Sequence, residues 1–457
     1  MTAEPRAARR PFVPFAVLGL SIAIAAAGQL GIIANLKAPH PLDADRTDVV
    51  EQTGPGAARL ERARIAGDIA FWSARLEANP SDIISATKLG QAQLESARAT
   101  GDISAYLRAE AAVDTALDAQ PTYLPARVVR ASALVALHRF AEARDVAQGI
   151  LGERPNDPTA LGVLGDASLE LGDIGAARGA YQTLTAVADS SAARIRRSHL
   201  SFLEGDAAGA VESAQQALAA AEEEALEGPA LAWYQYRLGD VLIATGDRSS
   251  AASAYGAALV TDPDSYLARS GLARVAAADG SWDAALAHLD AAIAAVPLPE
   301  LVARRADIYM LRAADGDAER ERRDRETVLA IAALAGDAAT VHDRMLSLYL
   351  ADHELDPARA LSLAEAEIEV RRDVYGYDAL AWALLANGRT EDADAAIERA
   401  LSLGTRDSRM LYHAGMIAAA LGEVERARRF LEEALALDSS FDPLAGARAR
   451  TTLAALP

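Results

Sequence analysis

The sequence contains no cysteine among its 457 residues. Disulfides, thiolate nucleophiles, zinc ribbons and iron–sulfur clusters are therefore all excluded, and so is the lipid-modified cysteine of bacterial lipoproteins. Lysine is almost absent as well, with only Lys37 and Lys88 present. We attribute this preference for arginine over lysine to coding bias, so a group of arginines in this sequence does not by itself indicate a phosphate site.

Aromatic residues make up only 5% of the chain although 51% of it is hydrophobic, because alanine supplies most of the hydrophobicity. An alanine-rich composition with few β-branched residues favours helix. Positive charge is also in short supply, since 45 lysines and arginines stand against 65 aspartates and glutamates, giving a formal net charge of -20. A chain this acidic repels phosphate backbones, so we expect no nucleic-acid partner.

Long apolar runs are absent except for one near the N-terminus. Residues 11–36 are broken by only three polar side chains, and roughly 20 apolar residues suffice to cross a bilayer. Arginines precede this run and aspartates follow it, which places the N-terminus in the cytoplasm by the positive-inside rule. The sequence therefore predicts a cytoplasmic basic tail at 1–10, a transmembrane signal anchor at 11–36 and a flexible stalk at 37–56, with the bulk of the chain extracytoplasmic.

A cleaved signal peptide is the alternative interpretation of the same segment. Ala25, Ala26 and Ala27 provide the small residues that a cleavage site uses, and cleavage there would release a secreted protein. Ile32 and Ile33 continue the apolar run well past this point. Because a signal peptide has a shorter apolar region, the length favours an uncleaved anchor.

A 34-residue period fills the rest of the chain. The turn glycines Gly246 and Gly280 are 34 residues apart, and so are Gly388 and Gly422. Each period contains two amphipathic segments joined by such a glycine, which is usually followed by an acid that can cap the second helix. One complete copy is marked by Leu238, Gly239, Leu242, Gly246, Ala251, Tyr255, Ala258 and Pro263. This pattern resembles the tetratricopeptide repeat (TPR).

The resemblance implies an all-α fold, a right-handed superhelical solenoid of antiparallel helix hairpins, preceded here by one transmembrane helix. It predicts a TPR solenoid of nine or ten repeats over 83–440, with a capping helix at 57–82 and another at 441–457, because such a stack needs capped ends. The charged stretch 319–326 makes one hairpin irregular or elongated. The units are expected to begin near residues 83, 124, 158, 191, 232, 266, 300, 341, 374 and 408.

The sequence offers little catalytic chemistry. His353 is followed by a glutamate, but Pro357 stands where a zinc-protease motif needs its second histidine. Phosphate-binding loops and nucleophile elbows are both absent from the sequence. We therefore expect no enzyme activity and no catalytic residue, metal site or cofactor.

In TPR proteins the first helices line a concave groove that takes a protein or peptide partner. Carried onto this chain, the resemblance implies a groove lined by His199, Phe202, Trp233, Tyr236, Asp240, Tyr349, Tyr375, Trp382, Tyr412 and Met416. Aromatic anchors commonly contribute ~1–3 kcal/mol each, but these rings can instead fill gaps between alanine-rich helices. The lysine–asparagine clamp that holds the acidic tail of cytosolic chaperones cannot be built, because Lys88 is the only lysine beyond the stalk.

Together these observations predict a membrane-anchored TPR scaffold that binds a protein or peptide partner and organises an envelope complex. An accessory factor for metal or cofactor delivery is the alternative, because His342 and His353 are close to three helical turns apart and can share one face of a helix.

Overall fold

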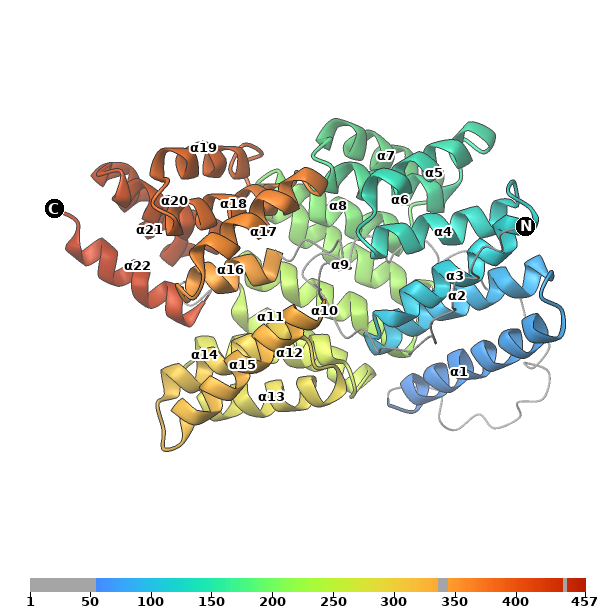
Figure 1. The fold of residues 1–457 in the computed structure, drawn as a ribbon, viewed down its shortest axis with the longest axis horizontal. Helices are drawn as coiled ribbons and strands as arrows, with labels where there is room; N and C mark the ends of the chain where they lie inside the picture. The colour runs from blue at the N-terminus through green and yellow to red at the C-terminus, as the bar shows by residue number, and fades with distance from the viewer. Residues whose placement is uncertain (1–54, 336–343, 439–441) are drawn as a thin grey trace, which may run out of the picture.

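A computed structural model describes residues 55–335, 344–438 and 442–457 (Figure 1). These residues form 22 helices and no strands, which confirms the expected all-helical solenoid. The helices are α1 (Pro55–Ala78), α2 (Ile83–Thr100), α3 (Ser104–Ala119), α4 (Leu124–Ala136), α5 (Phe140–Glu153), α6 (Pro158–Glu170), α7 (Ile174–Val187), α8 (Ser191–Leu203), α9 (Ala207–Glu223), α10 (Gly228–Ala244), α11 (Arg248–Thr261), α12 (Tyr266–Ala278), α13 (Trp282–Ala295), α14 (Pro299–Arg312), α15 (Asp317–Ala335), α16 (Arg344–Asp352), α17 (Pro357–Val370), α18 (Val374–Ala386), α19 (Thr390–Ala400), α20 (Ser408–Ala420), α21 (Val424–Leu437) and α22 (Pro443–Ala455).

None of the described helices is both long and apolar enough to cross a membrane. The predicted basic tail at 1–10 and signal anchor at 11–36 lie outside the described residues. The same is true of the predicted stalk at 37–56, except for Pro55 and Gly56, which already belong to α1.

The helices pair into antiparallel hairpins, from α2 with α3 through to α20 with α21, and α1 and α22 pack on the two ends. The first helices of the hairpins begin at residues 83, 124, 158, 191, 228, 266, 299, 344, 374 and 408, within four residues of the expected unit starts. Several first helices also approach the next first helix, as α4 does α6, α10 does α12 and α16 does α18. Since neighbouring elements are closest on the concave side of a curved stack, the first helices form its inner surface.

Small residues allow the two helices of a hairpin to approach closely. Tyr255 of α11 lies between Gly239 of α10 and Gly271 of α12, and a Cβ atom added to either glycine would lie 2.5 Å from the tyrosine ring. Tyr255 is fully buried there. Gly239 and Gly271, in the middle of their first helices, are therefore required by the ring that packs on them.

Aspartates cap several second helices. Asp173, Asp206 and Asp247 each follow a turn glycine and accept a hydrogen bond from the backbone N–H three residues ahead, at 2.9, 2.9 and 3.0 Å. A cap of this kind contributes about 1 kcal/mol to helix stability. The glycine–acid pairs of the sequence thus end one helix and begin the next.

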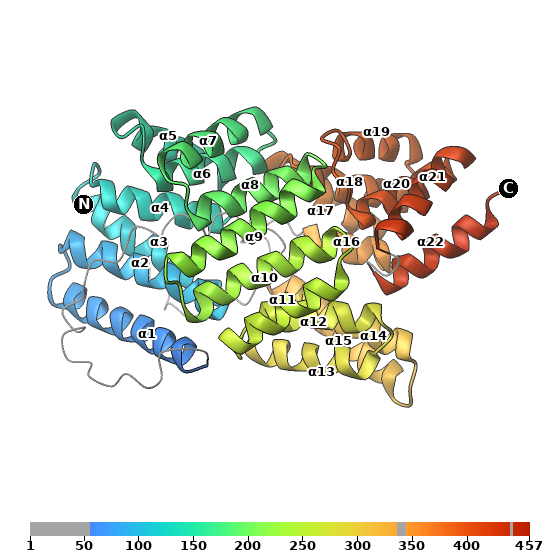
Figure 2. The ribbon, with the colours of Figure 1, turned by 180° about the vertical axis from the view of Figure 1, so that it is seen from behind.

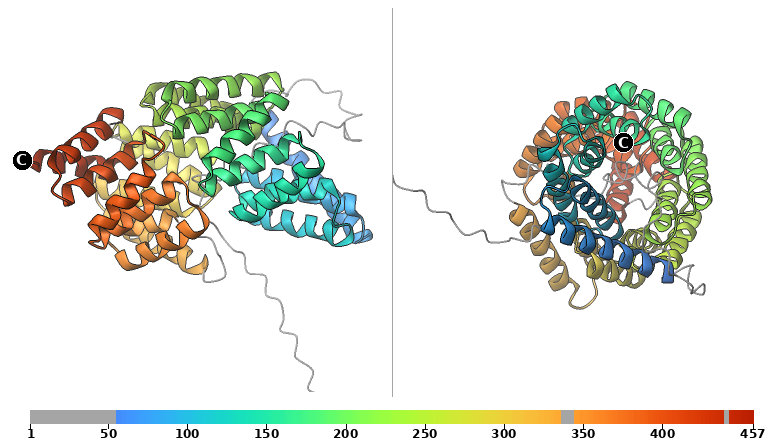
Figure 3. Two further views of the ribbon diagram at one scale, coloured as in Figure 1. Left: turned by 90° about the horizontal axis from the view of Figure 1, so that it is seen from above. Right: turned by 90° about the vertical axis from the view of Figure 1, so that its right-hand side faces the viewer.

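The stack curls through more than one turn, so that residues about 200 positions apart meet. Arg62 of α1 donates two hydrogen bonds, of 2.8 and 2.7 Å, to the Asp262 carboxylate after α11. Thr405, after α19, donates its hydroxyl to the Leu203 carbonyl oxygen of α8 at 2.6 Å. In the view from behind (Figure 2), helices α8 to α13 lie at the front. Seen along the long axis, the helices form a ring (Figure 3, right).

One buried carboxylate ties three consecutive helices together. Arg196 of α8 donates to both oxygens of Asp166 of α6, at 2.8 and 2.7 Å. Tyr181 of α7 donates its hydroxyl to the same carboxylate at 2.8 Å. Both charged side chains are only 1% exposed. Each has therefore lost its hydration, and the ion pair with the other compensates for that cost.

We predict that Asp166→Ala lowers the free energy of unfolding by about 3–5 kcal/mol, because it leaves the Arg196 guanidinium buried without its carboxylate. Urea unfolding followed by circular dichroism measures the change. Glu204→Ala is the matched control, because it removes the partner of the half-exposed Arg178 and is expected to cost at most about 1 kcal/mol. An equal loss of unfolding free energy in the two variants would contradict the role of Asp166 as the buried partner of Arg196.

Candidate partner-binding surface

The predicted groove residues all lie on first helices of the solenoid. Helix α8 carries His199 and Phe202, α10 carries Trp233, Tyr236 and Asp240, and α16 carries Tyr349. Tyr375 and Trp382 lie on α18, and Tyr412 and Met416 on α20. The family positions therefore place every one of these residues on a helix of the inner surface.

Four of these side chains are buried in the interior. Phe202, Tyr349, Trp382 and Tyr412 are at most 8% exposed. The Trp382 ring stacks on His413 with centroids 4.2 Å apart, and its indole N–H donates to the Asp352 carboxylate at 2.8 Å. For these four residues, the structure supports the alternative in which aromatic rings fill gaps between alanine-rich helices.

Five of the remaining side chains gather around Arg237 of α10, which the sequence analysis did not single out. The Arg237 guanidinium lies 5.8 Å from the Trp233 ring centroid and 3.6 Å from the Asp240 carboxylate. Its positive charge also acts on His199, Tyr236 and Tyr375. Because His199, Arg237 and Tyr375 come from α8, α10 and α18, this surface is built from two successive turns of the solenoid. Met416 lies apart, against the core of the C-terminal hairpins.

The histidine and two tyrosines around Arg237 are held in neutral forms. Burial, assisted by the positive charge of Arg237, lowers the pKa of His199 to about 4. Burial also raises the pKa of Tyr236 and of Tyr375 well above the usual range of a phenol. At neutral pH the surface therefore presents an uncharged imidazole and the Tyr375 hydroxyl beside a guanidinium, while the Tyr236 hydroxyl bonds to Asp240.

Charges of both signs act at this surface, and the carboxylates of Asp307 and Asp442 act on Arg304. Asp240 accepts a hydrogen bond from the Tyr255 hydroxyl at 2.8 Å. It also forms ion pairs with Arg274 of α12, at 3.3 Å, and with Arg237. Two guanidiniums thus share one carboxylate. Arg304 of α14 lies next along the inner surface, where it senses the charge of Arg274, and burial lowers the pKa of Arg304.

Several guanidinium nitrogens of this surface are buried without a hydrogen-bond acceptor. They are Nε of Arg237 and Nη1 of Arg304, and on α2 the Nε and Nη1 atoms of Arg98 show the same feature. An unsatisfied buried donor costs roughly 1–3 kcal/mol. A ligand that supplies oxygen acceptors would recover this cost, which makes the surface suited to carboxylates.

The sequence contains a signal that could have identified these arginines. Arg274 stands 34 residues after Asp240, so the two occupy the same position of adjacent repeats. Because equivalent positions on neighbouring first helices face each other, an acid in one unit and a base in the next predict an ion pair on the inner surface. The search for aromatic residues at groove positions found Trp233 but missed Arg237, which packs on its ring.

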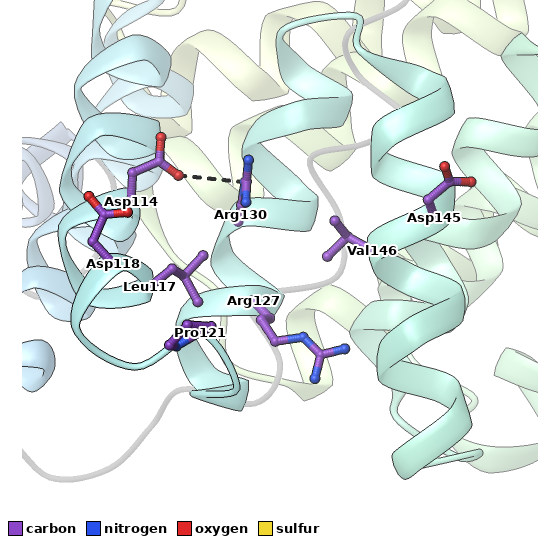
Figure 4. A pocket seen from close by; sticks show the side chains of 8 residues that line it. All are labelled: Asp114, Leu117, Asp118, Pro121, Arg127, Arg130, Asp145 and Val146. Carbon is purple, nitrogen blue, oxygen red and sulfur yellow. Dashed lines mark ion pairs between the residues drawn. The ribbon is translucent and has the colours of Figure 1, made fainter.

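A second hollow lies between second helices α3 and α5, over α4, with a volume of about 710 Å³ (Figure 4). Its arginines pair with neighbouring carboxylates, although Arg130 Nε lacks a hydrogen-bond acceptor, as Arg237 Nε does. Arg130 pairs with Asp114 at 3.5 Å, and Arg127 pairs with Glu153. The residues that line it include no aromatic ring, so we regard it as the weaker candidate.

No group of three or more metal-ligating side chains comes together in the part of the chain that the structure describes. His353 pairs with Asp307 at 3.0 Å, and His342, its supposed companion in metal delivery, lies outside the described residues. The alternative of a metal-delivery factor therefore gains no geometric support from His353.

We predict that Arg237→Gln raises the pKa of His199 from about 4 toward the ordinary histidine value of about 6.5. The reason is that a positive charge which disfavours the imidazolium has been removed, while burial still holds the pKa below the ordinary value. Titration of the histidine ring signals by NMR measures the shift. Arg248→Gln, at the start of α11, makes the same charge change where the arginine pairs with Asp279, and should leave His199 unchanged. An unchanged pKa in Arg237→Gln would disprove the proposed proximity.

The comparisons with known proteins agree with the repeat architecture. Residues 94–158, 236–298 and 379–440 match the family model of the tetratricopeptide repeat. Among solved structures, the chain is similar to a tetratricopeptide repeat protein from Parabacteroides merdae, with 19% identity, 58% of this chain and 100% of the other covered, and a TM-score of 0.32.

Two other solved structures align with a larger share of this chain. The human IFIT1 dimer with PPP-AAAA shows 12% identity over 82% of this chain and 88% of the other, with a TM-score of 0.45. Yeast Tom70 shows 14% identity over 86% and 93%, with a TM-score of 0.33. A search of curated proteins returned no match. Three segments of this solenoid, which together make up less than half of the chain, thus match the tetratricopeptide repeat.

Proposed function

We propose that the protein is a non-catalytic scaffold that binds a segment of a protein partner on the inner surface of its solenoid, at the cluster around Arg237. The observation that carries this proposal is the combination of half-buried aromatic rings with guanidinium nitrogens that lack acceptors. Aromatic and arginine side chains are the residues that most often dominate the energy of protein interfaces.

The chemistry of the surface favours a partner segment with acidic side chains. A guanidinium offers a planar fork of donors that matches a carboxylate, and Arg237, Arg274 and Arg304 present three guanidiniums near one another. The chain as a whole has a net charge of -20. Its repulsion of an acidic segment is screened beyond ~8 Å at physiological ionic strength, so the local arginines decide recognition.

The envelope remains the proposed setting of this scaffold. The support comes from the apolar run at 11–36 with arginines before it and aspartates after it. Reporter fusions after Leu36 and after Pro457 test the orientation, because both reporters should be active outside the cytoplasm. Activity of both reporters in the cytoplasm would overturn the proposed location and leave the binding surface to be tested separately.

We predict that the protein binds a labelled hexaglutamate peptide and does not bind hexalysine, as measured by fluorescence anisotropy at physiological ionic strength. Arg237→Ala should weaken binding about tenfold or more, corresponding to ~1.4 kcal/mol. Arg248→Ala on α11 removes the same charge outside this cluster and should bind as the wild type does.

Crosslinking from solubilised membranes gives the second test of this proposal. A partner recovered with the wild-type chain and with Arg248→Ala, but lost with Arg237→Ala, would support the assignment. Equal recovery with all three chains, or equal binding of the two peptides, would contradict it.

A further inference from the structure

Successive turns of the solenoid meet at a charged cluster that is shielded from solvent. Arg371, at the end of α17, donates through Nε to the Glu170 carboxylate at the end of α6, at 2.8 Å. The backbone N–H of Arg372 donates to the Glu170 carbonyl oxygen at 2.9 Å. Gly172, in the turn after α6, fits so closely that an added Cβ would lie 2.7 Å from the Arg372 carbonyl oxygen. Both side-chain and backbone contacts therefore join the two turns here.

The cluster contains three carboxylates and two guanidiniums. Arg344, at the start of α16, donates to Glu367 at 3.0 Å and to both oxygens of Asp373 at 2.7 and 3.2 Å. Arg371 also lies 3.4 Å from Glu367. All five side chains are at most 7% exposed. When every group is ionised the cluster has a net charge of minus one, which is costly to hold in a buried site.

Among the described residues, the groups that pack on this cluster are neutral or already paired. Burial and the positive charges of Arg371 and Arg344 lower the pKa of His138, before α5, well below its ordinary value, so it is neutral. Tyr181 of α7 is kept as a neutral phenol by burial and by the Asp166 carboxylate. Asp166 itself is paired with Arg196. Phe140 places its ring 5.4 Å from the Arg371 guanidinium and carries no charge. On the inner side His199 and Tyr375, both neutral, sense the charge of Asp373.

We propose that this cluster is a proton-dependent latch between successive turns of the solenoid. With one proton bound to a carboxylate, the three acids and two arginines have no net charge. In this state the end of α6 stays bound to residues 371–372, which connect α17 to α18. When that proton leaves, the buried site carries a net negative charge, the contact weakens, and the turns separate.

The proton is assigned to Glu170. Burial raises the pKa of Glu170 to about 7; Arg371 opposes this rise and the charge of Asp373 adds to it. Burial acts in the same direction on Asp373, but Arg344 and Arg371 outweigh it and lower the pKa of Asp373. Because the pKa of Glu170 is higher in the folded chain than in the unfolded one, the stability of the contact is greatest at low pH and falls as pH rises from about 4.5 to about 7.

The latch is connected to the inner surface through α18. Asp373 caps this helix by accepting the Gly376 N–H at 2.6 Å, and Tyr375 lies two residues further along. The charge of Asp373 also acts on His199. Separation of the turns would therefore carry Tyr375 away from His199 and Arg237, and so alter the surface that the two turns build together.

A distance measurement across the contact tests the latch directly. The chain has no cysteine, so a variant with Ala176→Cys on α7 and Ser362→Cys on α17 carries spin labels only at these two positions. Both positions are exposed. The distance between the labels is measured by pulsed electron spin resonance from about pH 5 to about pH 9. We expect it to lengthen with a midpoint near neutral pH. A distance that does not change over this range would overturn the proposal.

Two variants establish which group responds. Glu170→Gln keeps the shape of the side chain without its ionisation, and should stay in the short-distance state at every pH. Asp373→Asn keeps an effective helix cap and leaves two acids for two arginines, so it should also lose the response. Far-UV circular dichroism checks that each variant is folded, and Glu204→Gln, at an exposed pair, should respond as the wild type does. A pH response that persists in both folded variants would assign the titration to another group and refute the latch.

Discussion

The close approach of paired helices through alanine and glycine is the constraint on which the rest of this structure depends. Tyr255 is completely buried because Gly239 and Gly271 leave room for its ring on both sides. Alanine buries little apolar area per residue, so no single hairpin can be stable alone. Stability must be summed over neighbouring hairpins, as in other repeat solenoids, and the part of the chain that the structure describes consists of stacked helices alone.

The same close spacing curves the stack, and the curvature brings distant residues together. Contacts between Arg62 and Asp262, and between Thr405 and Leu203, join positions about 200 residues apart. Charged groups become buried at these contacts because two surfaces that would face solvent in a straight stack now face each other. A buried carboxylate or guanidinium must find a partner or change its protonation, which explains why Glu170 differs from the exposed acids of the chain.

The inner surface follows from the same geometry. Helices α8 and α10 belong to one turn and α18 to the next, and Arg237 senses residues of all three. Sequence reasoning predicted a groove that includes His199, Trp233, Tyr236, Asp240 and Tyr375, because family positions mark the inward face of each first helix, and these five lie around Arg237. It also included Phe202, Tyr349, Trp382 and Tyr412, which are buried, because position within a repeat does not tell how far a ring sinks between two helices.

The sequence by itself determined the helices, their pairing and the repeat period, because these depend on local signals: glycine at turns, aspartate at caps and small residues at fixed spacings. Ten unit starts lay within four residues of the observed helices for this reason. Only the tertiary structure decided that Arg237 is the centre of the inner surface and that Arg371 meets Glu170. Such contacts depend on the small rotation between each hairpin and the next, accumulated over a whole turn, and no single repeat encodes it.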